Sequence, residues 1–433
     1  MRAALRRSFV LLVVVASPAL AQDGQPAPAK PKPADTEQPA ETLPPESIRP
    51  PTFTDNVNQE IDTMRPRHAG ILPNGPVSLI DPVFDDLNRK LYESMGLKFG
   101  LAYTTAFQWA SDGEEKDASA GDVDLFARWR VFGEEKSGTR SMLGVNGEYR
   151  HDFGDAVPKD LSKQFGSLWR TTNGYGTQDP ELTQCWWEQH LAEDKVVVTV
   201  GKLDADNFYN EYRYQSDSKA FLSKAFSSNP ARQHPGNGLG GNVLARVMKD
   251  WYVSAGVQDA NGNKAKSGFH TIDEGDLFTA VEVGWTPTFE NLGKGAYRLE
   301  YWHTDEATIE GFPEDKGVAL SCEQEIGKSY VPFFRAAWSD GDATGVTDFV
   351  AAGIGLEGVV RAKQDLTGIA VAWGRPSDSS FDDQVSAEVF HRFQVAPDVQ
   401  ITLGYQYYLD PSFAPPGDDD PVGVFEIRVR IEF

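Results

Sequence analysis

A stretch near the middle of the chain gathers side chains that could bind a small polar molecule. Carboxylate, amide and guanidinium groups hydrogen-bond to hydroxyls, and aromatic rings stack on an apolar ring face. Within residues 204–239 the candidates selected among side chains of these kinds are Asp206, Asn207, Tyr209, Asn210, Tyr212, Arg213, Tyr214 and Phe221. The alternative interpretation is that the aromatic residues form a small core of the loop itself.

Other charged residues recur at every second position of apolar segments. In GDVDLFARWRV, residues 121–131, Leu125 and Trp129 share one strand face, whereas Asp124 and Arg128 share the other. A Lys or Arg facing lipid costs roughly 2–4 kcal/mol at the bilayer centre, so the charged face must meet water. Most of these charged residues are expected to pair with one another, and His190 is interpreted as a hydrated wall residue. The candidate lining residues on this parity are Arg128, Arg130, Glu148, Arg150, Trp186, Glu188, His190, Arg246, Arg298, Glu300, Glu388, Arg428 and Arg430.

Alternation of this kind runs through most of the chain. Strands place successive side chains on opposite faces, and Gly, Asp, Asn or Pro bounds each segment. The pattern predicts an all-β fold, a 16-stranded antiparallel transmembrane β-barrel, which encloses an aqueous channel. The predicted strands are 97–110, 121–133, 140–153, 182–191, 195–203, 240–249, 251–258, 276–287, 295–306, 316–327, 330–341, 347–358, 365–376, 383–395, 399–410 and 422–433.

The connections between these segments alternate in length. Long or acidic connections, such as 154–181, 204–239 and 259–275, follow odd-numbered strands, and short ones such as 396–398 follow even-numbered strands. Outer-membrane barrels sort their loops in this way, with long extracellular loops and short periplasmic turns. The even strand count places both chain ends on the periplasmic side. The longest connection, 204–239, is the predicted constriction loop.

The residues before the barrel divide into three predicted parts. Residues 1–21 have a basic start, an apolar centre and the small residues Ala19-Leu20-Ala21, which is typical of a cleaved signal peptide. Residues 22–80 are predicted to be a Pro-rich, flexible periplasmic segment. DPVFDDLNRKLYESM, residues 81–95, has an apolar stripe at helical spacing and predicts a short helix. Elsewhere no apolar run approaches the 18 residues of a membrane-spanning helix.

Charge and cysteine usage exclude some classes of function. The net charge of −23 becomes −26 when the first 21 residues, with their three Arg, are removed, which disfavours binding to nucleic acid. Cys185 and Cys322 lie on the strand face that is expected to meet lipid, in two predicted strands that are far apart around the barrel. A disulfide between them is therefore not expected. The acidic stretches 378–383 and 418–420 could bind calcium but are interpreted as solvated loop tips. No catalytic carboxylate pair is evident, and we expect no enzyme activity, cofactor or metal site.

Several stretches resemble a known family. GKLDADNFYN (201–210), the aromatic-rich loop that follows with its Asn-Pro, and GVQDANG (256–262) are similar to carbohydrate-selective porins of the OprB type. WWEQHLAEDKVVVTVGKLD (186–204) and FHRFQVAPDVQITLGYQYYLDP (390–411) resemble other parts of that family. The resemblance covers roughly 81–433. It implies an outer-membrane porin that lets glucose and related sugars diffuse passively.

The class also implies partners. These are monosaccharide substrates, outer-membrane lipid and lipopolysaccharide, and the barrel assembly machinery, because terminal Phe433 resembles its recognition signature. The sequence does not decide between a single barrel and a homotrimer. The alternative function is a general or cation-preferring diffusion porin, which the acidic charge favours. A third hypothesis, an outer-membrane enzyme or adhesin barrel, predicts no open-channel conductance.

Overall fold

A computed structural model describes residues 70–78, 81–133, 138–269, 271–414 and 420–433. The predicted signal peptide and most of the predicted flexible segment lie outside these residues. All described residues belong to one compact unit. In the described part of the chain, no helix has the length and apolar character needed to span a membrane.

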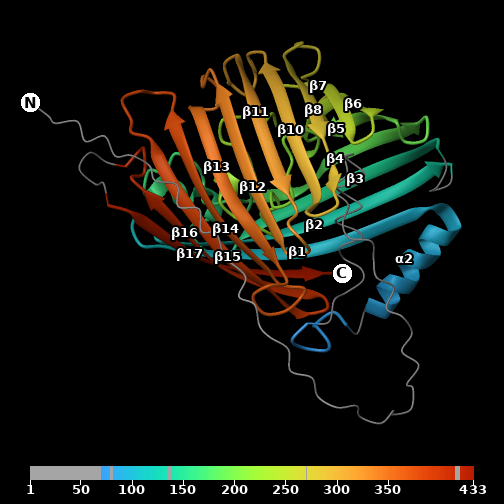
Figure 1. Cartoon of the computed structure of the whole chain (residues 1–433), viewed down its shortest axis with the longest axis horizontal. Helices are drawn as coiled ribbons and strands as arrows, with labels where there is room; N and C mark the ends of the chain where they lie inside the picture. The colour runs from blue at the N-terminus through green and yellow to red at the C-terminus, as the bar shows by residue number, and fades with distance from the viewer. Residues whose placement is uncertain (1–69, 79–80, 134–137, 270, 415–419) are drawn as a thin grey trace, which may run out of the picture. The chain divides into compact units, whose positions relative to one another are not determined.

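The structure is a closed antiparallel β-barrel with few helices, and β1 pairs with both β2 and β17. Figure 1 shows the first strands beside the last ones, with helix α2 next to β1. The helical elements of the described residues are α2 Asp81–Met95, α3 Pro158–Leu161, η1 Ser162–Gln164, η2 Ala205–Asn207 and α4 Lys224–Ser227. The strands are β1 Leu97–Ala110, β2 Asp117–Phe132, β3 Arg140–Asp152, β4 Gln178–Leu191, β5 Val196–Leu203, β6 Gly238–Met248, β7 Trp251–Asp259, β8 Leu277–Trp285, β9 Thr288–Phe289, β10 Gly293–Thr304, β11 Asp315–Gln324, β12 Tyr330–Ser339, β13 Val346–Glu357, β14 Leu366–Pro376, β15 Gln384–Ala396, β16 Val399–Leu409 and β17 Val422–Glu432.

The sixteen predicted strands are confirmed, each shifted by a few residues at most. The additional strand, β9, has two residues and pairs only with the start of β10. The predicted sorting of the connections is also present. The long connections 153–177, 204–237 and 260–276 lie at one end of the barrel, and 192–195, 249–250 and 397–398 lie at the other.

Strand β10 shows why the alternating pattern closes into a barrel. Leu299 and Tyr301 are 53% and 50% exposed on the outer face, whereas Arg298 and Glu300 are buried on the inner face. The outer face is therefore apolar, and the inner residues find hydrogen-bonding partners inside the barrel. Closure pairs every spanning strand on both sides, so the sheet has no open edge.

Helix α2 caps the seam between the first and last strands. The ring of Phe84 lies 5.8 Å from that of Phe99 on β1 and 6.5 Å from that of Phe433. Asn88 exchanges two hydrogen bonds with the backbone of Phe99. The structure has a helix over 81–95, and Phe84 of its apolar stripe packs against the barrel end, whereas Leu87 is 46% exposed.

Part of the predicted flexible segment is ordered. The backbone N–H groups of Ile71 and Leu72 donate to the carbonyls of Gln394 and Val395 at the end of β15. The Val77 N–H donates to the Asp398 carboxylate in the following turn, over 2.9 Å. Residues 70–78 are thus attached to the barrel, and the prediction of flexibility does not hold for them.

Candidate functional site: the barrel interior

The 204–237 connection contains two short helical turns, and one of its own polar residues caps each of them. Asp204 accepts a hydrogen bond from the backbone N–H of Asp206 at the start of η2. Ser223 accepts one from the N–H of Ala225 at the start of α4. Side-chain oxygens at these positions satisfy N–H groups that a helix start leaves free. The connection therefore has its own local structure.

Charged wall residues hold the backbone of this connection inside the barrel. Glu282 on β8 accepts from the N–H of Asn210 at 2.6 Å, and Glu388 on β15 accepts from the N–H groups of Leu222 and Ser223 at 2.7 and 2.9 Å. Arg428 on β17 donates to the carbonyls of 217 and 220. Because β8, β15 and β17 are distributed around the barrel, the connection spans the interior between them.

Arg232 is the buried ion-pair centre of the connection. Its Nε lies 2.8 Å from a carboxylate oxygen of Glu300 on β10, and its Nη1 donates to Asp206. Asp206 also contacts His234. Burial raises the pKa of Asp206, but the contacts with His234 and Arg232 outweigh it and hold that pKa below its ordinary value. Burial lowers the pKa of His234, with Asp206 opposing the shift. A buried guanidinium needs such partners to offset its lost hydration.

The predicted residue Arg213 makes a second set of ion pairs. Its guanidinium contacts Glu325 after β11 and Glu357 at the end of β13, the latter at 3.0 Å. The Tyr214 hydroxyl donates to the same Glu357 at 2.8 Å. These contacts attach the middle of the connection to β11–β13, opposite its start at β5.

The aromatic residues of the connection pack against the wall. Tyr212, Tyr214 and Phe221 are at most 4% exposed, and their rings meet Phe333 of β12 at 4.9, 6.1 and 5.6 Å. Gly355 leaves room for one of them, because a Cβ there would lie 2.1 Å from the Tyr214 ring. These side chains form an aromatic core, as in the alternative interpretation, but the core includes Phe333 of the wall and does not belong to the loop alone. Tyr209, 5% exposed, instead donates its hydroxyl to Asn242.

A second inward segment, 153–177, was not anticipated. The indole N–H of Trp169 donates to Ser386, and Gln384 bonds to Ser167 and Leu168. These wall partners belong to β15. A Cβ at Gly374 would lie 2.7 Å from the Trp169 ring, so glycine in β14 admits that ring. The length of this connection, together with its tryptophan, was the sequence feature that could have indicated an inward fold.

A small hollow of about 20 Å³ lies where the 204–237 connection meets the wall. It is lined mainly by polar side chains, and it is wide enough for a water molecule. Sequence reasoning named three of its lining residues and missed the others, because their roles depend on distant partners. The lining residues are Asp206, Tyr209, Asn210, Gln215, Ser227, Ser228, Asn229, Arg232, His234 and Arg335.

Several predicted lining residues lie away from this hollow. Arg130 donates to Tyr92 of α2, and Arg246 donates to the carbonyl of Asp194 in a short turn. His190, 3% exposed, contacts Glu188 and Asp194. The interpretation of His190 as a hydrated wall residue is therefore wrong, because neighbouring carboxylates enclose it.

The remaining predicted residues are buried on the inner wall or pair with one another. Arg298 contacts Glu323 at 3.2 Å, and Arg430 contacts Glu432 at 2.8 Å. Neither carboxylate was among the predicted lining residues, and the expected mutual pairing is seen instead for Arg150, which contacts Glu148. The Nε of Arg128 meets Met142, and Trp186 is 1% exposed. Asn207 extends toward the wall and donates to Gln184.

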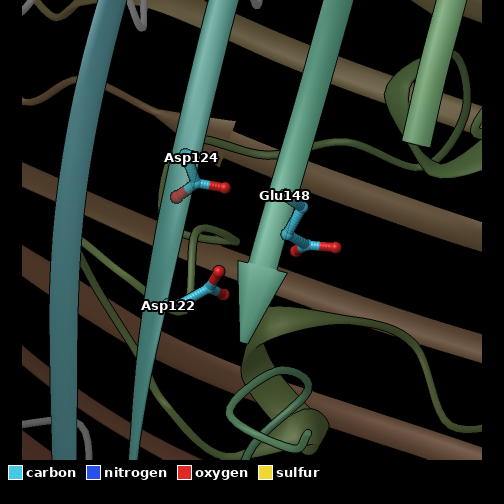
Figure 2. A group of neighbouring side chains, drawn as sticks. All are labelled: Asp122, Asp124 and Glu148. Carbon is cyan, nitrogen blue, oxygen red and sulfur yellow. The ribbon is translucent and has the colours of Figure 1, made fainter. Parts of the chain in front are cut away.

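Three carboxylates on β2 and β3 form a possible cation cluster. Figure 2 shows Asp122 and Asp124 on one strand and Glu148 on the next, and one oxygen of each lies within 4.8 Å of the others. Arg150 already donates to both Asp122 and Glu148, and Lys264 donates to Glu148 at 3.0 Å. A metal ion would have to displace these two cations, so the donor set does not favour a metal site. Of the acidic stretches considered for calcium, 418–419 lies outside the described residues.

The model of the "Carbohydrate-selective porin, OprB family" matches residues 151–321 and 314–433, well over half of the chain. The chain belongs to the OprB family. A high-pH structure of Pseudomonas putida OprB superposes with a TM-score of 0.65 at 16% identity, over 81% of this chain and 97% of that one. A low-pH structure of the same protein gives 0.52 at 14% identity, over 81% and 96%.

Among curated proteins, the chain is similar to porin AaxA of Chlamydia muridarum, with 22% identity over 280 residues. The match covers 63% of this chain and 59% of AaxA, so it spans about three fifths of that relative's length. The OprB assignment and the barrel together make this a porin of the outer membrane, and they indicate a channel rather than an enzyme. The predicted family and fold are both confirmed.

Proposed function

We propose that this OprB-family barrel lets glucose and related neutral sugars diffuse passively across the outer membrane. The observation that carries the proposal is the attachment of 204–237 to inner-wall residues of β8, β10, β15 and β17. A connection held in this way narrows an aqueous channel, and a narrow polar passage can select by hydrogen bonding while binding weakly enough for release.

The constriction is proposed to be polar rather than aromatic. Asp206 is 31% exposed at its side chain and borders the hollow, whereas the neighbouring tyrosines are buried. Carboxylate, amide and hydroxyl groups are therefore the candidates for sugar contacts. Among the predicted lining residues, Asp206 and Asn207 are the strongest. The wall arginines are proposed to position the connection.

Recording from single channels in planar bilayers tests this function. Glucose at millimolar to molar concentration is expected to reduce conductance in a saturable way, because a bound sugar obstructs ion flow. The Asp206→Asn variant is expected to weaken that block, and Lys266→Gln, on an exposed loop, serves as the control. Conductance that glucose leaves unchanged would overturn the sugar assignment.

A general or cation-preferring porin is the second candidate, and the net charge of −23 favours it. The reversal potential in a salt gradient separates the two candidates. Strong cation selectivity without sugar block supports the second. We further propose that the exposed apolar outer face contacts lipid and lipopolysaccharide, and that residues 1–21 direct export. Trimer formation and contact of Phe433 with the assembly machinery stay predictions.

A further inference from the structure

We propose that Lys159, Arg170 and Lys224 form a site for the anionic group of a sugar, so that the channel also accepts monosaccharides that carry a carboxylate or phosphate. This inference rests on the proposed sugar function and extends its substrate class. No residue of this trio was among the lining residues predicted from the sequence.

The two inward segments bring the three residues together. Lys159 lies in α3 and Arg170 follows η1, both in 153–177, whereas Lys224 begins α4 in 204–237. The backbone N–H of Lys224 donates to the carbonyl of Arg170 at 3.1 Å, which joins the segments at this point. The backbone N–H of Lys159 donates to the carbonyl of Tyr175 at 3.3 Å, which folds α3 back onto the end of the same segment.

The trio lacks the counter-ions that other interior cations have. Arg150, Arg213 and Arg232 each contact two carboxylates. Among the described residues, the side chains of Lys159, Arg170 and Lys224 have neither a hydrogen bond nor an ion pair, and all three are only partly exposed. Three partly buried positive charges without partners are costly unless an anion or water solvates them.

The charges of the trio also act on one another. Burial lowers the pKa of Lys224 to about 8, and the nearby Arg170 and Lys159 contribute in the same direction, while Asp206 opposes. Burial and then Arg170 lower the pKa of Lys159. Burial is the larger cause of both pKa shifts, and repulsion between the neighbouring cations adds to it. A bound anion would relieve this repulsion, so the trio is matched to a negative ligand.

Neighbouring groups point to a sugar rather than to a bare anion. Ser227, at the end of α4, lines the polar hollow, and so does Asp206, which acts electrostatically on Lys224. Gln215 and Asn229 also line the hollow, and Gln215 is partly exposed whereas Asn229 is buried. The hollow itself has room only for water, so an anionic monosaccharide would place its charge on the trio and turn its hydroxyls toward the partly exposed Asp206 and Gln215. Arg and Lys together suit carboxylate and phosphate groups alike.

Planar-bilayer block by four compounds tests the site: glucose, glucuronate, glucose 6-phosphate and acetate. In the wild type, glucuronate or glucose 6-phosphate is expected to block at lower concentration than glucose, and acetate is expected not to block. Comparison of the two anionic sugars shows which anionic group is preferred. Block by glucose tests the proposed function separately, so failure of the one idea is distinguishable from failure of the other.

Neutralising the trio in the triple variant Lys159→Gln, Arg170→Gln, Lys224→Gln removes charges that repel one another, so the barrel is expected to fold. Each lost cation should weaken block by the anionic sugar by about three- to fivefold, with glucose block unchanged. Lys266→Gln is the matched control and should alter neither. The proposal would be overturned if the triple variant weakened block by glucose as much as block by the anionic sugars, or if it weakened neither. It would also be overturned if acetate blocked the wild type as strongly as the anionic sugars do.

Discussion

Asn210 illustrates how single residues of the interior are used. Its backbone N–H donates to Glu282, its side-chain oxygen accepts from Arg335 and Asn229, and its φ of 54° is left-handed. Asn tolerates this backbone conformation better than most residues. Two wall charges, Glu282 and Arg335, thus bond to this one residue of the connection. The buried polar groups are costly when one partner is lost, which makes them sensitive points for tests.

Replacing Arg232 by Met is expected to loosen the 204–237 connection. The change leaves Glu300, 0% exposed, without its cation, and breaking such a buried pair costs about 3–5 kcal/mol. Higher or noisier single-channel conductance is the expected readout. Adding Glu300→Gln should restore most of the wild-type behaviour. Lys316→Gln, which breaks a pair with Asp340 in which both side chains are 56% exposed, is the control. Single-channel recordings of Arg232→Met that match those of the wild type would contradict this account.

Acidification is expected to loosen the same region through His234. Its folded pKa is lowered below 6.5 by burial, so the folded state rejects a proton that an opened state accepts. The contribution of His234 to stability is therefore fully present above about pH 6.5 and is lost as the pH falls below that value. Asp204, whose pKa burial raises to about 6, acts in the opposite sense, since it gains a proton more readily when folded. Asp206, Arg232 and Lys224 are the other charges nearby.

Comparison with His234→Gln isolates the contribution of the histidine. Current fluctuations of the wild type should increase between pH 7.5 and 5.5, whereas those of the variant should increase less. Identical pH dependence in both proteins would show that His234 is not the responsible group.

At the scale of elements, two inward connections and a wall with small residues form one interface. Ala319, Ala337, Ala351 and Ala370 on β11–β14 are buried beside the aromatic residues of the connections. Small inward residues on these strands leave the volume that those rings fill, as close packing requires. This interface, rather than hydrogen bonds alone, keeps the 204–237 connection inside.

Truncating Phe221 to Ala is expected to destabilise the packed connection by about 3–5 kcal/mol, because a cavity replaces a fully buried ring. The ring lies 4.9 Å from Phe390 and 5.2 Å from Phe226 and is 0% exposed. Faster protease cleavage within 204–237 is the expected result. The strands should stay folded, as judged by migration of the unheated protein on gels.

The exposed Phe269, 74% accessible, provides the control for Phe221. Phe269→Ala should leave the cleavage rate at its wild-type value. Unchanged cleavage in Phe221→Ala, or loss of the whole barrel, would contradict a role confined to the connection.

For the whole molecule, the important division is between an outer face for lipid and an inner face for water. Cys185 on β4 and Cys322 on β11 are both free thiols. Their strand parity places them outward, in register with Val145 and Tyr297 of the neighbouring strands. The predicted absence of a disulfide between them agrees with this placement.

Thiol labelling tests this division in protein reconstituted into vesicles. A lipid-soluble maleimide is expected to react with the two cysteines, and a charged, water-soluble maleimide is not, because lipid covers the outer face. Lys266→Cys, on an exposed loop, should react with the charged reagent and serves as the positive control. Rapid reaction of Cys185 or Cys322 with that reagent would place them on the water side.

The sequence alone was sufficient for the barrel, its sixteen spanning strands and the sorting of its connections. Side chains alternate with period two along a strand, and lipid excludes charge, so local polarity decides which face is outward. The tertiary structure alone decided which interior groups meet. Glu388 binds Leu222 across 166 residues, and Arg428 reaches the carbonyl of Asp217 across 211. Such pairs have no local signal, because they depend on how two connections fold into a closed ring of strands.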